Sequence, residues 1–187
     1  MKFTIKRDML LDALNNVSRG LSSKTPMPVL TGIKIEVANN NITLITTNRE
    51  ISVRVILDQA ETVDITENGV CVVPGKYFID IIKKLEGDDV EFTLFDSNTI
   101  KIISEKTTFT LISLDHTNFP NINFEVNSEP ISINSKKIKT FIRQTSFAAG
   151  INEARLILTG VCLEIEKNVI QMTATDSYRL AKKVVAV

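Results

Sequence analysis

The fold is decided by two stretches of sequence that share one pattern, TGIKIEVANNNITLITTN at residues 31–48 and TGVCLEIEKNVIQMTATD at residues 159–176. In the first stretch, apolar and polar side chains alternate from Ile33 to Val37, and an Asn39-Asn40-Asn41 turn leads into a second apolar run. The second stretch repeats the alternation from Val161 to Ile165. Each stretch therefore predicts strands with one buried face, joined by a polar turn.

The two stretches belong to a longer repeat that has one constant offset and no gaps. A strand is predicted at residues 3–5 and again at 131–133, and an amphipathic helix at 8–19 and again at 136–147. Identical residues recur at this offset, namely Ile5 and Ile133, Ser18 and Ser146, Thr31-Gly32 and Thr159-Gly160, Glu36 and Glu164, Asn40 and Asn168, Ile42 and Ile170, and Thr47 and Thr175. Self-similarity at one period indicates a protein built by repeating one unit.

A further unit of the same order lies between the two copies. It has a strand at 70–73, a helix that begins at Pro74-Gly75 and runs to Leu85, and three strands up to residue 114. The sequence therefore predicts an α+β fold of repeated β-α-β-β-β units, with helices on one face of antiparallel sheets. We expect one domain of two units at residues 1–122, a linker at 117–129, and a second, incomplete domain of one unit at 129–187.

Composition and charge restrict the classes of protein to which this chain can belong. The chain has 187 residues, is 43% hydrophobic, and carries 22 basic and 22 acidic side chains, so its bulk charge gives no support to general DNA affinity. The charged residues near Met1 are unlike a signal peptide, and no apolar run is long enough to span a bilayer, which favours the cytoplasm and no membrane partner. Cys71 and Cys162 lie far apart and are expected to be buried or half-buried thiols in a reducing compartment.

The sequence contains no recognisable set of catalytic residues. The sole histidine, His116, stands beside Asp115 in the expected linker without a placed nucleophile. The sequence holds no metal-ligand cluster and no glycine-rich phosphate loop, and Pro74-Gly75-Lys76 lacks the required glycine spacing. We therefore expect a protein that is not an enzyme and needs no cofactor or metal.

Five short segments, in one order along the whole chain, carry a resemblance to a known family. They are MKFTI at 1–5, PVLTG at 28–32, VPGK at 73–76, NFPN at 118–121 and ATDSYRLA at 174–181. Together they resemble the bacterial DNA polymerase III β subunit, the DNA sliding clamp. The resemblance implies three similar domains in a full chain and a homodimeric ring with helices lining the hole. Such a ring holds DNA polymerase III on duplex DNA without reading sequence, and it also docks the clamp loader and other clamp-binding proteins.

One predicted helix carries a basic stripe. Lys136, Lys139 and Arg143 share one face of helix 136–147, while Ile138, Phe141 and Ile142 form the other. On the residues alone an ordinary solvated face is favoured, but the resemblance implies that this helix faces DNA. By the same resemblance, the DNA-binding set extends to Lys83 and Lys84 on the second helix and to the loop residues Lys24 and Asn152. Where some family members have paired aromatics, this chain has Leu156-Ile157.

The resemblance also implies a pocket for short hydrophobic partner peptides. On the residues alone, the same segment is interpreted as a structural hairpin. Its expected residues are Leu158, Thr175, Ser177, Tyr178, Arg179 and Leu180. The commonest family form has Gly-His where Ser177-Tyr178 stand, so we expect an altered pocket shape. The other wall would come from the third domain, for which this chain holds no counterpart, so we expect weak or no binding of such peptides.

Residues 109–114 hold four apolar side chains and predict either a strand covered on both faces or, by the resemblance, an edge strand. In the second case Phe109 and Leu111 pack against a partner subunit. Because the partner surface would lie in the third domain, we expect no closed ring from this chain. One alternative stays open for the whole chain, which is a clamp-fold scaffold or self-associating protein with no DNA role.

Overall fold

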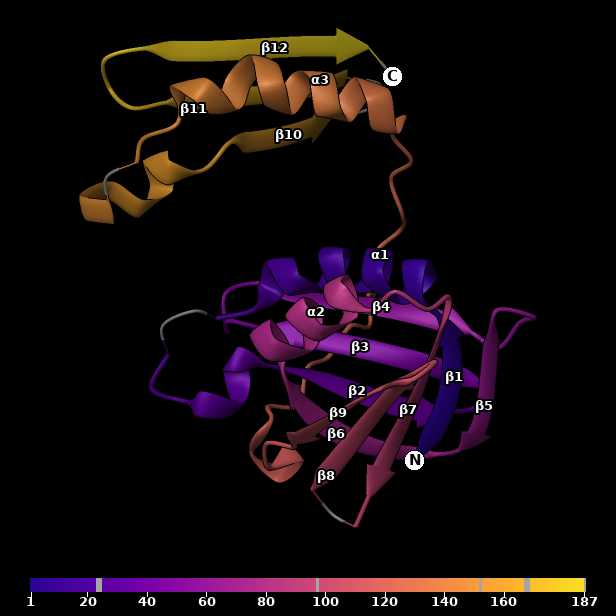
Figure 1. Ribbon diagram of the computed structural model, residues 1–187. Helices are drawn as coiled ribbons and strands as arrows, with labels where there is room; N and C mark the ends of the chain where they lie inside the picture. The colour runs from indigo at the N-terminus through magenta and orange to yellow at the C-terminus, as the bar shows by residue number, and fades with distance from the viewer. Residues whose placement is uncertain (23–24, 97, 152, 167–168, 187) are drawn as a thin grey trace. The chain divides into compact units, whose positions relative to one another are not determined.

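The chain forms two compact units, Met1–Phe124 and Glu125–Val187, in a computed structural model (Figure 1). The structure describes residues 1–22, 25–96, 98–151, 153–166 and 169–186. Each unit is a layer of helix on antiparallel sheet, which confirms the predicted α+β fold class. The two units are described separately below.

Unit 1 contains two antiparallel sheets with the strand orders β5-β1-β7-β8-β9 and β4-β3-β2-β6. The helices α1 and α2 contact each other and lie side by side on the sheets (Figure 1). The elements are β1 (Lys2–Lys6), α1 (Arg7–Val17), β2 (Gly32–Ala38), β3 (Asn41–Thr47), β4 (Ser52–Asp58), β5 (Val63–Glu67), β6 (Gly69–Pro74), α2 (Gly75–Lys84), β7 (Asp89–Phe95), β8 (Thr99–Ser104) and β9 (Thr107–Ile112), with the 3₁₀ helices η1 (Ser18–Gly20), η2 (Pro28–Thr31) and η3 (His116–Asn118).

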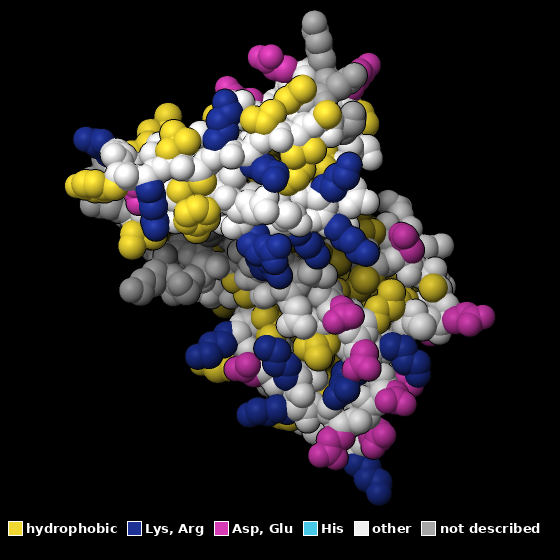
Figure 2. Space-filling view, turned by 90° about the horizontal axis from the view of Figure 1, so that it is seen from above, with side chains coloured by type: hydrophobic (Ala, Val, Ile, Leu, Met, Phe, Trp, Pro, Cys, Tyr) yellow, Lys and Arg dark blue, Asp and Glu magenta, His cyan; other side chains and the backbone are white. Residues whose placement is uncertain are grey.

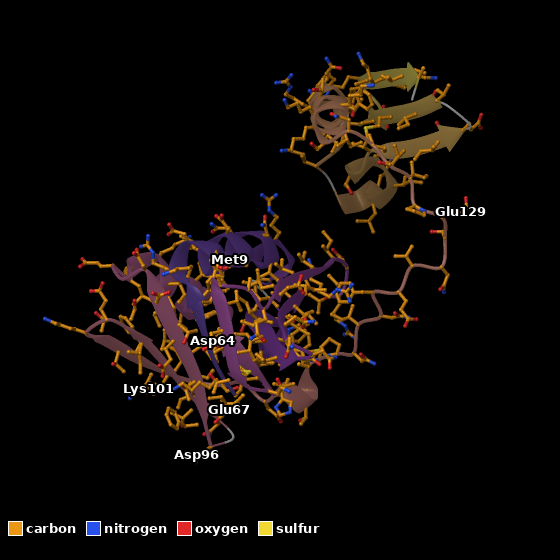
Figure 3. The ribbon with its side chains drawn as sticks, turned by 90° about the vertical axis from the view of Figure 1, so that its right-hand side faces the viewer. Met9, Asp64, Glu67, Asp96, Lys101 and Glu129 are labelled. Atoms are coloured by element: carbon orange, nitrogen blue, oxygen red, sulfur yellow. The ribbon has the colours of Figure 1, made fainter. Side chains whose placement is uncertain are left out.

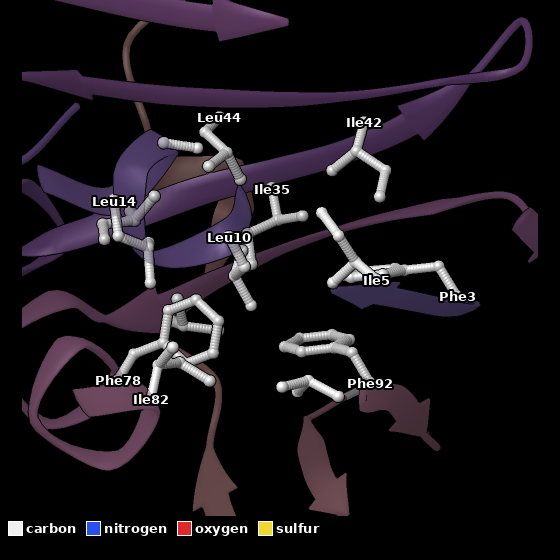
Figure 4. Packing of buried hydrophobic residues seen from close by; sticks show 14 of the residues in the cluster. Phe3, Ile5, Leu10, Leu14, Ile35, Ile42, Leu44, Phe78, Ile82 and Phe92 are labelled. Carbon is white, nitrogen blue, oxygen red and sulfur yellow. The ribbon is translucent and has the colours of Figure 1, made fainter. Parts of the chain in front are cut away.

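The core of unit 1 lies between the helices and both sheets (Figure 4). Phe3 of β1 stacks on Phe92 of β7 with ring centroids 4.9 Å apart, and Phe78 of α2 meets Phe92 edge-on at 5.9 Å. Leu10 and Leu14 enter from α1, and all five side chains are fully buried. Aromatic pairs in these geometries add stability beyond their buried area, so the three rings tie helix and sheet together.

Unit 2 is a single layer of helix on a sheet of order β10-β11-β12. The helix begins where the Asn134 side chain accepts hydrogen bonds from the backbone N–H groups of Lys136 (3.0 Å) and Lys137 (3.3 Å), because such a cap satisfies donors left free at a helix N-terminus. The elements are α3 (Ser135–Thr145), η4 (Ser146–Ala148), η5 (Glu153–Thr159), β10 (Cys162–Glu166), β11 (Val169–Thr175) and β12 (Leu180–Ala186).

The structure confirms the gapless repeat with its constant offset. The helix α3 and the strands β11 and β12 begin and end at the positions that this offset gives from α1, β3 and β4. Strand pairing obeys the same offset, since Thr47 pairs with Ser52 and Thr175 pairs with Leu180. The repeat therefore extends from sequence to the register of individual residues.

The strand predicted at residues 131–133 is wrong, because the structure shows no strand there. In unit 1 the matching strand, β1, pairs with β5 and β7. The positions that match β5 and β7 at the offset of the repeat would fall after residue 187. Among the described residues of unit 2, segment 131–133 therefore has no equivalent strand with which to pair. An extended segment needs such a partner to satisfy its backbone groups as a strand.

One strand was not predicted, and one expectation about the cysteines needs correction. The sequence did not predict β5, whose residues Val63–Glu67 pair with β1 although only Val63 is buried. Cys71 is buried as expected, and burial raises the pKa of its thiol to about 12, whereas Cys162 is exposed on β10. Cys162 is exposed because it matches Lys34 in the repeat, and Lys34 lies on the face of β2 opposite the core residues Ile33 and Ile35.

The predicted linker at 117–129 is only partly a linker. The ring of Phe119 is buried in a cluster with Val29, Leu30 and Val72 of unit 1. Residues up to Phe124 belong to unit 1, so the apolar side chains in this segment outweigh its turn-forming residues. Beyond them the chain runs extended towards Glu129 (Figure 3).

Candidate functional sites

The predicted basic stripe lies on the exposed side of α3. Lys136, Lys139 and Arg143 are all exposed, while Phe141 and Thr145 are buried against the sheet. The helix contains no acidic residue that could neutralise the stripe from within. The three cations are therefore available to an anionic partner such as a phosphate backbone.

One residue of the expected apolar face is placed differently. Ile138 is half-buried and Phe141 buried, but 46% of the Ile142 side chain is exposed. Its counterpart in the repeat, Leu14, is fully buried in unit 1, where α1 packs against α2. In the described part of unit 2 no second α-helix lies beside α3, so Ile142 has no such cover.

The remaining predicted DNA contacts are less distinctive. Lys83 and Lys84 are exposed in the last turn of α2, where cations also stabilise a helix through its dipole. Lys24 and Asn152 lie outside the described residues. In Figure 2, Lys and Arg side chains, drawn in dark blue, lie at the surface of each unit.

The predicted peptide site contains a tightly bonded turn. The Asp176 carboxylate accepts hydrogen bonds from the backbone N–H groups of Arg179 (2.9 Å) and Tyr178 (3.0 Å) and pairs with the Arg179 guanidinium (2.9 Å). These bonds, led by the Arg179 N–H, hold the pKa of Asp176 below its usual range. Thr175 Oγ1 donates to the Arg179 carbonyl (2.7 Å), and Ser177 adopts a positive φ of 77°.

A pocket of about 610 Å³ opens beside this turn, entirely within unit 2. Of the predicted residues, Leu158, Ser177, Tyr178 and Arg179 line it. The lining residues that the prediction missed are Ala149, Gly150, Ile151, Arg155 and Asp176.

Two predicted pocket residues have other roles. Thr175 bonds within the turn, and Leu180 starts β12 with 64% of its side chain exposed. Of the missed residues, Asp176 belongs to the turn itself, and the others come from or adjoin a loop closed by a hydrogen bond from the Gly150 N–H to the Leu158 carbonyl (2.8 Å). The Arg155 guanidinium donates to Ser177 Oγ (3.2 Å) and joins this loop to the turn, a contact for which the sequence carries no local signal.

The strand β9 lies at the edge of its sheet. Phe109 and Leu111 are half-buried and pack against the core of unit 1, whereas 61% of Ile112 is exposed. The expectation of a strand covered on both faces is therefore wrong, because β9 has one covered and one open face. The edge itself remains available for pairing, as the subunit-interface prediction requires.

The structure gives Asp115 a structural role. Its carboxylate caps η3 by accepting hydrogen bonds from Thr117 Oγ1 (2.7 Å) and the Thr117 N–H (3.0 Å), which lower the pKa of Asp115. Among the described residues, no group of His, Cys, Asp and Glu side chains could hold a metal ion. In the same residues, no helix is long and apolar enough to cross a membrane.

Two domains of one family match this chain in order. The N-terminal domain of the DNA polymerase III beta subunit matches residues 1–123, and the central domain matches residues 132–187. The chain belongs to the DNA polymerase III beta subunit family. The predicted resemblance to this family is thus confirmed.

Individual members of the beta subunit family agree with this assignment. The beta sliding clamp of Staphylococcus epidermidis is 40% identical over 185 residues, which cover 97% of this chain and 49% of that protein. The sliding clamp of Bacillus subtilis superposes with a TM-score of 0.94 at 34% identity, and the beta chain of Streptococcus pneumoniae with 0.93 at 33%, each covering 100% of this chain and 50% of the other. The chain thus spans about half the length of the relatives it matches.

Proposed function

We propose that this chain is part of a DNA sliding clamp, a non-catalytic protein that tethers DNA polymerase III to duplex DNA in the cytoplasm. Membership of the beta subunit family carries this proposal, since its matched relatives are named sliding clamps. The uncompensated basic stripe of α3 supports a DNA-facing role for that helix. Phosphate contacts hold a protein on DNA without reading its sequence, which is what sliding requires.

The DNA role is tested by fluorescence anisotropy of a labelled duplex at several salt concentrations. Each phosphate contact steepens the dependence of log affinity on log salt by about 0.9. Reversing the charge at Lys136, Lys139 and Arg143 should therefore weaken binding and reduce the slope by about three. The matched control reverses three lysines on strands or turns, Lys101, Lys106 and Lys182, and should leave the slope unchanged. Equal loss in both variants would contradict the assignment.

We further propose that the pocket beside residues 175–179 contributes to docking of short apolar peptides from DNA polymerase III, the clamp loader and other partners. A concave site with a few polar groups suits such peptides. Isothermal titration with a short Leu- and Phe-containing peptide should give weak or no binding to this chain. A tight complex that Leu158→Ala abolishes would mean that unit 2 suffices, against our expectation that a second wall is needed.

Ring formation is proposed only for the full-length chain, as a homodimer in which the β9 edge, with Phe109 and Leu111, meets the partner. Analytical ultracentrifugation of the 187-residue chain should show no closed annular dimer. A clamp-fold scaffold without a DNA role is the second candidate, and the zero net charge favours it. That candidate predicts no salt-dependent duplex binding at all, so the anisotropy titration separates the two.

A further inference from the structure

Unit 1 shows how two β-α-β-β-β units complete each other. The first strand of each, β1 or β6, pairs with the second strand of the other, β7 or β2. The exchange has the same register in both directions, since Ile5 pairs with Val90 and Val73 pairs with Ile33. The helices α1 and α2 also contact each other. A unit of this kind is therefore complementary to another unit like itself.

Unit 2 is a third unit of the same kind, and both of its exchange surfaces are open. At the offset of the repeat, residues 131–133 match β1, and β10 lies in the stretch that matches β2. In the described part of unit 2, β10 is an outer strand of its sheet and residues 131–133 belong to no strand. The backbone groups along such an edge are a template for a further strand.

Two exposed apolar side chains lie on these same surfaces. Ile131 is 59% exposed and Leu163 is 48% exposed, whereas the matching Phe3 and Ile35 are fully buried in unit 1. In unit 1, Phe3 lies on β1 and Ile35 on β2, so each belongs to a strand that pairs with the other half. What covers these positions in unit 1 is thus a second unit of the same kind.

We propose that unit 2 is a self-association surface, on which segment 131–133 of each copy pairs with β10 of a second copy about a two-fold axis. The register of unit 1 then places Ile131 opposite Leu163, and Ile133 opposite Val161, in both directions. The contact is self-complementary, as a two-fold interface requires. The β9 edge takes no part, so this dimer is not a ring and does not depend on binding to DNA.

The same register allows a covalent test, because it places Ser132 opposite Cys162, as Val72 lies opposite Lys34 in unit 1. The Val72 carbonyl accepts a hydrogen bond from the Leu114 N–H (2.8 Å), on the edge of β6 away from β2. The pair with Lys34 is therefore of the close type without hydrogen bonds, in which the Cα atoms are about 4.5 Å apart. A disulfide can span that separation.

Ser132→Cys is incubated with oxidised glutathione, which accepts the two electrons released when a protein disulfide forms. A non-reducing gel should show a covalent dimer, and peptide mass spectrometry should locate the bond between position 132 and Cys162. Ser128→Cys is the matched control, since it adds the same thiol at an exposed position outside the pairing. It should give no more dimer than the wild type. Equal cross-linking of both variants, or a bond only within one chain, would overturn the proposal.

Sedimentation velocity tests the association without cross-linking. The 187-residue chain should shift towards a dimer with rising concentration, because two copies must meet. Leu163→Asp would bury an unpaired carboxylate twice in the interface and should raise the dissociation constant about tenfold or more.

Val184→Asp is the matched control for Leu163→Asp. Val184 is 50% exposed on β12, and its counterpart Ile56 is 47% exposed in unit 1, so a second unit does not cover this position. This variant should associate like the wild type. A monomer at every concentration, or an equal loss of association in both variants, would contradict the proposed surface.

Discussion

The helices α1 and α3 occupy the same place in two copies of one unit, yet they present different charges to solvent. The stripe of Lys136, Lys139 and Arg143 on α3 corresponds to Asp8, Leu11 and Asn15 on α1. Both helices have the same length and pack on equivalent strands. The fold therefore does not require the basic stripe, which supports a role for it in binding.

The turns of the two copies differ in the same way. Arg49 and Ser177 share a positive φ of 78° and 77°. Asn48 Oδ1 accepts hydrogen bonds from the N–H groups of Glu50 (3.0 Å) and Ile51 (2.7 Å), as Asp176 does from the matching residues. The backbone of the turn thus belongs to the repeat. What is specific to the candidate peptide pocket is its side chains.

The largest difference between the copies should be in stability. Leu14 is fully buried, so Leu14→Ala should lower the unfolding free energy of unit 1 by about 2–5 kcal/mol. The matching Ile142→Ala in unit 2 should cost less than about 1 kcal/mol, because that side chain is already half in water. Urea unfolding followed by backbone amide NMR signals of each unit measures both. Equal losses would mean that Ile142 is covered in solution.

A smaller effect on stability is expected at two contacting positions where one copy has a small and a larger side chain, Gly20 and Thr46, and the other copy has two alanines. A Cβ at Gly20 would lie 2.5 Å from Thr46 Oγ1, so Gly20→Ala should cost about 1–3 kcal/mol of unfolding free energy. Unit 2 has Ala148 and Ala174 at the matching positions, both buried. Adding Thr46→Ala should therefore recover part of the loss.

Thr46→Ala alone is the control, because it also removes the hydrogen bond from Thr46 Oγ1 to the Val17 carbonyl. Chemical denaturation of the wild type, both single variants and the double variant gives the coupling energy. Additive losses would show that the clash at Thr46 does not set the cost of Gly20→Ala.

The sequence predicts those parts of the fold whose side chains make a periodic pattern. The alternation from Ile33 to Val37 and the constant offset of the repeat identified the strands and helices of both copies, because alternation and helical spacing are local properties. The prediction of a strand at residues 131–133 failed because a strand depends on a partner far along the chain. For the same reason Phe119 looked like linker and Arg155 was missed in the pocket, since each is placed by residues far along the chain.

The smallest expected effect is a different response of the two turns, at Asp176 and at Asn48, to a fall in pH. The pKa of Asp176 is lowered, so its ionised form stabilises the turn above the unfolded-state pKa, and that stabilisation is lost as pH falls through the folded-state pKa. The amide signals of Tyr178 and Arg179 should therefore shift in acid, below a pH of about 4. The amide signal of Ile51 in the matching turn should shift less, because Asn48, which accepts its hydrogen bond, does not titrate. Matching shifts in both turns would point to general acid unfolding.

The most direct test of the whole account is an NMR titration of the ¹⁵N-labelled chain with a short DNA duplex at low salt. The account predicts that amide signals around Lys136, Lys139 and Arg143 on α3 move, while those around Asp8, Leu11 and Asn15 on α1 move far less. The movement should disappear as salt is raised. Equal movement of both helices, or movement confined to the sheets, would contradict the claim that the second copy of the unit carries the DNA-binding stripe.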